Sequence, residues 1–73
     1  MRVIVTEHAR QRLREGRQLG VTVADVTHAA QSIPGRIRGA TRFRGFVSID
    51  GSVFDIVAKD LDNGRLVITV IGK

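Results

Sequence analysis

The 73-residue chain contains no cysteine, tryptophan or tyrosine, and a single proline. Without cysteine it can form neither a disulfide framework nor a thiolate zinc site, and two histidines alone make a poor metal cage. No apolar run approaches the ~20 residues that span a bilayer, and the N-terminus lacks the apolar core of a signal peptide. We therefore expect a cytoplasmic protein with no metal, no cofactor and no membrane anchor.

The length allows one small domain over residues 1–73. A domain of this size buries only ~60% of the surface that its unfolded chain exposes, so its stability margin is thin. An enzyme with a separate cofactor-binding domain is excluded.

Negative charge is scarce in the first part of the sequence. Residues 1–44 contain nine arginines against three acidic residues, whereas residues 45–73 carry a slight negative excess, and the whole chain has a net charge of +5. Arginine predominates among the basic residues, and its planar guanidinium group suits phosphate. A basic half on a small domain indicates a polyanionic partner, most often nucleic acid, although solvated charge that serves solubility is the alternative.

The first half of the chain predicts one strand and two helices. The β-branched run Val3–Val5 is typical of a strand. Thr6 is a suitable N-cap for a helix over residues 7–18. Thr22, followed three residues later by Asp25, predicts the start of a second helix, which the single proline ends.

After the proline, the apolar period changes from 3.6 to 2, which indicates strands. Residues 36–38 are expected to begin a strand, and residues 42–49 alternate. Asp50-Gly51 and Asn63-Gly64 predict tight hairpins, and the second leads into an apolar final strand over 66–71. We expect an α+β fold of order β-α-α-β-β-β, with room for one more strand, in which both N-terminal helices pack on one face of an antiparallel sheet.

The first predicted helix carries the main candidate for chemistry. At 100° per residue, His8, Arg12 and Glu15 share one ridge. A histidine beside an arginine at the edge of a packed helix is a candidate acid/base, although a structural histidine bonded to a backbone carbonyl is equally compatible. His28 falls on the polar side of the second helix and is expected to be exposed and inert. A basic ridge on the opposite flank of the first helix comprises Arg10, Arg14 and Arg17, which are expected to bind RNA.

The predicted sheet supplies a second cluster. Arg42, Arg44 and Phe46 are expected to share one strand face, and the Asp50-Gly51 register places Lys59 opposite Arg42 and Asp55 opposite Phe46. Arginine and lysine would hold phosphate while the phenylalanine stacks on a base. The alternative is an ordinary polar outer face on which Phe46 is covered by the second subunit of a homodimer.

Other chemistries lack their motifs: there is no phosphate-binding glycine loop, no serine nucleophile elbow and no pair of carboxylates. The chemistry that remains is general acid/base catalysis without a metal, carried out by His, Arg, Lys and Thr side chains. Cleavage of RNA through its own 2′-OH fits this inventory, because the substrate supplies the nucleophile. The Asn63-Gly64 register pairs Thr69 with Ala58 on the face toward the helices, near the first helix.

The segment Thr6–Leu13, which reads Thr-Glu-His-Ala-Arg-Gln-Arg-Leu, resembles the opening of a bacterial and phage family of uncharacterised small domains. Asp25-Val26 and Val67–Val70 match that family's next helix and last strand. Such domains are similar to toxin ribonucleases of the RelE/BrnT type. The resemblance implies RNA as substrate, including ribosome-bound mRNA, a cognate antitoxin as partner, and a catalytic set of His8, Arg12, Lys59 and Thr69, with Arg44 on the RNA.

Three hypotheses follow. The first is a toxin-like, metal-independent endoribonuclease. The second is a non-catalytic nucleic-acid or ribosome-binding module on the same fold, in which His8 is structural. The third is a protein-interaction regulator whose last strand or sheet edge completes a homodimer. Convergence of His8, Arg12 and Thr69 on the arginine-bearing surface would favour the first.

Overall fold

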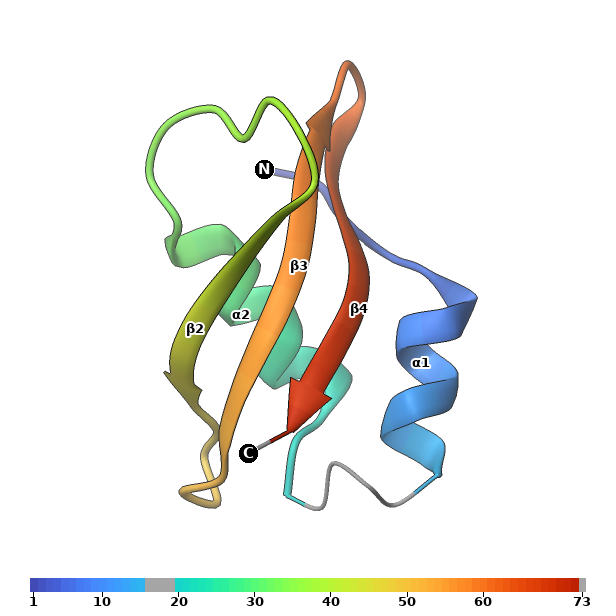
Figure 1. Ribbon diagram of the computed structural model, residues 1–73, viewed down its shortest axis with the longest axis vertical. Coiled ribbons are helices and arrows are strands. Elements are labelled where there is room, and N and C mark those ends of the chain that lie inside the picture. Colours follow the sequence, from blue (N-terminus) through green and yellow to red (C-terminus); the bar gives the residue numbers. More distant parts are fainter. Residues whose placement is uncertain (16–19, 73) are drawn as a thin grey trace.

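The computed structural model describes residues 1–15 and 20–72, which form a small α+β domain with two helices and one four-stranded sheet (Figure 1). The elements in chain order are β1 (Val3–Val5), α1 (Glu7–Arg14), α2 (Val23–Ser32), β2 (Thr41–Val47), β3 (Val53–Leu61) and β4 (Gly64–Gly72). The strand order in the sheet is β1-β4-β3-β2, and β1 runs parallel to β4. The sheet is therefore mixed rather than antiparallel, because no hairpin turn sets the direction of the first strand.

Both helices begin where the sequence predicts. The Thr6 side chain accepts a hydrogen bond from the third residue of α1. The hydroxyl of Thr22 accepts from the backbone of Asp25 at 3.1 Å, while the Asp25 carboxylate accepts from the backbone of Thr22 at 2.9 Å. This reciprocal capping box satisfies two donors that a helix start would otherwise leave unpaired. α1 ends at Arg14, and the remainder of its predicted extent, from residue 16, lies outside the described residues.

The two helices occupy different places on the sheet (Figure 1). α2 lies behind it and packs on β1, β3 and β4, whereas α1 packs along β4, beyond the end of β1. The expectation that both helices pack on one face is thus met by α2, while α1 lies along the sheet edge. The core between α2 and the sheet contains Val26, Ala29, Ala30, Phe54, Ile56, Ala58, Val67 and Val70. No helix in the described residues is long and apolar enough to cross a membrane.

The hairpin between β2 and β3 has a longer turn than the sequence predicts. The backbone of Ser48 donates to the carbonyl of Ser52 at 2.9 Å, which leaves the three residues Ile49–Gly51 in the loop. Gly51 has φ +87°, the left-handed conformation that such a loop needs at its last position. The register therefore differs by one residue from that of a two-residue turn.

A β-bulge in β2 changes the face of one candidate residue. Phe43 lies opposite Ile56 and Phe46 lies opposite Phe54, so two residues of β2 stand against the single Asp55. Gly45, with φ +83°, provides the extra residue. The bulge turns Phe46 to the α2 side, where its ring centroid is 5.8 Å from that of Phe54. Phe46 therefore does not share a face with the strand's arginines, contrary to prediction.

The register between β3 and β4 also differs from prediction: Leu61 pairs with Gly64, so the turn consists of Asp62 and Asn63 rather than of Asn63 and Gly64. Ala58 pairs with Val67 but Val57 pairs with Thr69, so Ile68 is an extra residue in β4. This shift moves Thr69 from the predicted helix side to the opposite face of the sheet. Lys59 lies opposite a leucine of β4 rather than opposite an arginine of β2.

Residues 36–38 form no strand, contrary to prediction, although they are held against β3. Ile37 is buried; its carbonyl accepts from the backbone of Asp60 at 2.7 Å, and its own N–H donates to the Asp60 carboxylate at 2.9 Å. These two hydrogen bonds to Asp60 take the place of the ladder that a strand would form with β3. The preceding Pro-Gly pair and the following Gly39 interrupt a regular strand here.

Candidate nucleic-acid interface

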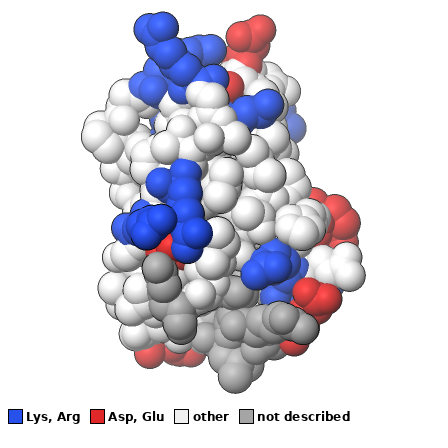
Figure 2. Space-filling model, in the orientation of Figure 1, with Lys and Arg blue, Asp and Glu red and all other residues white. Residues whose placement is uncertain are grey.

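The face of the sheet that points away from α2 has no described helix over it; we call it the open face (Figure 1). Figure 2 looks onto this face and shows a largely uncharged surface with Lys and Arg toward its margins. Pairing and strand alternation assign its central floor to half-buried residues, namely Ile4, Val57, Leu66, Thr69 and Ile71. A broad apolar floor with cationic margins can receive a ligand that is both anionic and partly apolar.

One row of side chains crosses three strands of the open face. Arg42 of β2 lies opposite Val57 of β3, and Val57 lies opposite Thr69 of β4. Because neighbouring strands lie about 4.8 Å apart, the backbones of Arg42 and Thr69 are roughly 10 Å apart. A guanidinium and a hydroxyl thus stand on opposite sides of one valine.

A buried carboxylate fixes the arginine of this row. Asp55 is fully buried, and its Oδ2 accepts from Nε and Nη2 of Arg42 at 3.0 and 2.8 Å. Its Oδ1 accepts from the backbone of Gly45 at 3.0 Å, which ties the bulge to the same group. Sequence reasoning assigned Asp55 no such role; the available signal is one acidic residue inside the apolar run of β3.

The other end of the row meets α1. The hydroxyl of Thr6 donates to the carbonyl of Ile68 at 2.7 Å, and Nε of Arg12 donates to the carbonyl of Val70 at 2.8 Å. These two bonds attach both ends of α1 to the edge of β4. The half-buried Arg12 is therefore partly structural, which its spacing alone did not indicate.

The attachment brings three predicted catalytic residues to one place. His8 lies in α1 between the two anchoring residues, and Thr69 lies in β4 between the two carbonyls that they bind. His8 is exposed and lies one turn before Arg12, on the same flank of the helix. Among the described residues, His8 has no hydrogen-bond or ion-pair partner. His8 and Thr69 thus belong to the two segments that these bonds join.

The remaining predicted residues divide between the open face and other surfaces. Arg44 and Lys59 follow the alternation of the open face. On the far flank of α1, Arg14 forms an ion pair with Glu7 and, by that hydrogen bond, lowers the pKa of Glu7. Arg10 shares that flank. Arg17 lies outside the described residues.

Other kinds of site find little support in the part of the chain that the structure describes. It contains no group of three or more His, Asp or Glu side chains placed to hold a metal ion. His28 is exposed on α2, as predicted. No family model, curated protein or solved structure matches the chain. Inference about function therefore starts from the open face itself.

Proposed function

We propose that the open face binds RNA, and that the chain is a metal-independent endoribonuclease in which His8 moves the proton. The observation that carries this proposal is the row from Arg42 through Val57 to Thr69, together with the attachment of α1, the helix that carries His8, to β4 on either side of Thr69. The RelE/BrnT-like resemblance of the opening segment points to the same activity.

The residues have complementary parts in binding. Arg44 and Lys59 are cations without an ion-pair partner among the described residues, and they attract the phosphate backbone. Arg42 adds a fixed guanidinium, because Asp55 holds it in place. The aliphatic floor around Val57 gives a nucleotide base an apolar surface. Together these groups favour a single strand that lies across β3.

The chemistry would use the RNA 2′-OH as nucleophile. His8 takes its proton, or gives one to the leaving 5′ oxygen, since an imidazole exchanges protons readily near neutral pH. Arg12 is anchored to β4 through Nε, and its terminal nitrogens have no described partner. They can stabilise negative charge on the phosphorus-bound oxygens. Thr69, on the floor of the open face, can donate a hydrogen bond from its hydroxyl to the RNA.

Two exposed histidines provide a matched test. His8→Ala and His28→Ala remove the same exposed group from different helices. Each variant is incubated with a labelled single-stranded RNA in EDTA, and cleavage and binding are measured separately. We expect His8→Ala to lose about 10²–10⁴-fold in cleavage rate while it keeps its RNA affinity, because acid/base catalysis contributes that much. His28→Ala should behave as the native protein does.

Two results would count against this proposal. Equal cleavage by the His8→Ala and native proteins would remove His8 from catalysis. RNA binding without any cleavage by the native protein would leave the non-catalytic binding module as the function of the open face.

A further inference from the structure

β2 is the uncovered edge of the sheet. In the described residues its one strand neighbour is β3, so the outer backbone edge of β2 has no ladder partner. α2 packs on the other three strands, and β2 projects past it. The phenylalanines on the α2 side of β2, Phe43 and Phe46, are half-buried in consequence. An edge of this kind is where an extended chain can add to a sheet.

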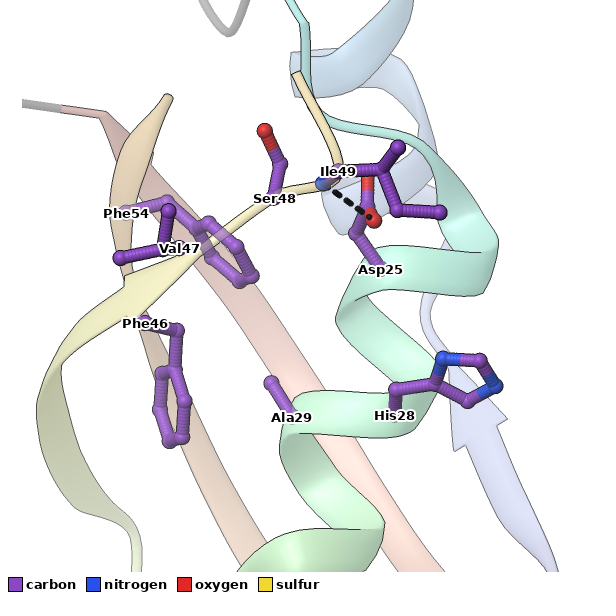
Figure 3. Close-up of a pocket in the computed structure, with 8 residues that line it drawn as sticks. All are labelled: Asp25, His28, Ala29, Phe46, Val47, Ser48, Ile49 and Phe54. Carbon is purple, nitrogen blue, oxygen red and sulfur yellow. Dashed lines mark hydrogen bonds between the residues drawn. The ribbon is translucent and has the colours of Figure 1, made fainter. Parts of the chain in front are cut away.

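A cavity of about 280 Å³ lies between this projecting strand and α2 (Figure 3). Phe46 and Phe54 form one wall, and Ala29 of α2 faces them, while the His28 ring points away. At the open end of the cavity, Val47 and Ile49 are 64% and 90% exposed. The cavity therefore offers a volume of side-chain size, with an aromatic wall, beside an open strand edge.

Two of the three polar side chains that line the cavity, those of Asp25 and Ser48, already have partners, and the third, His28, has its ring turned away. The Asp25 carboxylate accepts from the backbones of Thr22 and Ile49, bonds that lower the pKa of Asp25. The Ser48 hydroxyl accepts from the backbone of Ser52 at 3.0 Å. Since these groups are satisfied within the fold, the cavity suits an apolar side chain better than a polar metabolite.

The opposite side of the same strand is cationic. Arg42 and Arg44 project from β2 onto the open face, and Arg44 has no ion-pair partner among the described residues. Side chains of an added strand alternate between the two faces, so an apolar residue entering the cavity would be followed by one that faces Arg44. The residue that suits this second position is acidic.

We infer that β2 docks an extended peptide of a partner protein in which apolar and acidic residues alternate. A second copy of this chain is a poor occupant, because pairing two β2 edges would bring the arginines of both copies together. The bulge at Gly45 also shortens any regular ladder along the edge, so the cavity and Arg44 supply much of the selectivity. This inference does not depend on the proposed ribonuclease activity.

Synthetic peptides test the inference on the intact chain. The probe is an acetylated octapeptide in which glutamate and leucine alternate, and its affinity is measured by calorimetry. Two controls keep the same leucines: one replaces glutamate by lysine, and the other is N-methylated at every second residue so that it cannot donate to the strand edge. We expect micromolar binding by the probe, and no measurable binding by either control.

Charge reversal and methyl signals locate the contact. Arg44→Glu should weaken binding of the probe roughly tenfold, whereas Arg10→Glu, the same change on α1, should leave it unchanged. Methyl resonances of Ala29 and Val47 should shift on binding, while those of Leu66 on the open face should not. Equal affinity for the N-methylated peptide, or shifts confined to the open face, would overturn the inference. So would a dimer in sedimentation that the probe peptide dissociates, since the edge would then be occupied by a second copy.

Discussion

Arg65 of β4 and Asp60 of β3 lie opposite each other in the sheet, with Nε of Arg65 2.7 Å from Oδ1 of Asp60. The guanidinium is 1% exposed, and it also donates to three carbonyls at 2.7 to 2.8 Å, those of Ala30, Ile33 and Gly35. One buried cation thus satisfies the C-terminal end of α2 and holds the loop that follows it. Carbonyls at the end of a helix otherwise need water or a cap.

Loss of this arginine should severely destabilise the fold. Arg65→Met leaves a carboxylate and buried carbonyls without their donor, and breaking a buried ion pair costs about 3–5 kcal/mol. Arg14→Met is the matched control, because its ion pair with Glu7 is exposed and such pairs contribute little to stability. Urea denaturation followed by circular dichroism measures both. Similar midpoints for the two variants would show that Arg65 is not a structural centre.

Acid should weaken the same contact. The hydrogen bonds from Arg65 and from the backbone of Ile37 lower the pKa of Asp60 to about 2, against 3.8 for an unperturbed aspartate. A carboxyl group whose pKa is lower in the folded state stabilises the fold above the unfolded pKa, and that contribution disappears as pH falls. The loss should extend from about pH 4 to about pH 2. In Asp60→Asn, the free energy of unfolding should be lower at pH 5 and should fall less over this range; an unchanged pH profile would contradict the assignment.

Local signals predicted the elements, whereas the strand registers were set by single residues. Thr6 and Thr22 cap helices through contacts within four residues of sequence, and these starts are confirmed. Each register depends on where its turn lies and on one extra residue, Gly45 in β2 and Ile68 in β4, and a bulge leaves no periodic trace in the sequence. The parallel pairing of β1 joins segments some sixty residues apart, beyond the reach of any turn signal.

Some features of the candidate site were likewise predicted from the sequence, and others were not. The 3.6-residue period places His8 and Arg12 on one flank, and the structure has them there. Thr69 was expected near the first helix through a register that is wrong, and it reaches the edge of α1 because the bulge at Ile68 turns it to the open face. The anchoring roles of Asp55 and Arg65 could not be read from the sequence, because their partners lie on other elements.

The bulge glycine should matter for binding as well as for stability. Gly45 and Gly51 both have φ near +85°, and a Cβ at either position would meet no atom within 4 Å. Replacement by alanine therefore costs conformational energy alone, about 1–2 kcal/mol at each position. The backbone N–H of Gly45 also donates to the carboxylate that holds Arg42. Alanine keeps this N–H, but a bulge that relaxes to relieve the strain moves it, so Gly45→Ala should reduce RNA affinity while Gly51→Ala does not. Chemical denaturation measures the stability of each variant, and fluorescence anisotropy measures its RNA affinity. Equal RNA affinities of the two variants would show that the bulge plays no part in binding.

The salt dependence of RNA binding should separate the two basic surfaces. Arg44→Gln with Lys59→Gln removes two charges from the open face, and Arg10→Gln with Arg14→Gln removes two from the far flank of α1. Both double substitutions change the net charge by the same amount, so a difference between them in RNA binding reflects where the charges lie. Each phosphate contact contributes about 0.7 to the slope of log affinity against log salt concentration for a single strand. The open-face pair should lower that slope by about 1.4 at two contacts, and the α1 pair should leave it near the native value. A larger loss from the α1 pair would place the RNA on the helix rather than on the sheet.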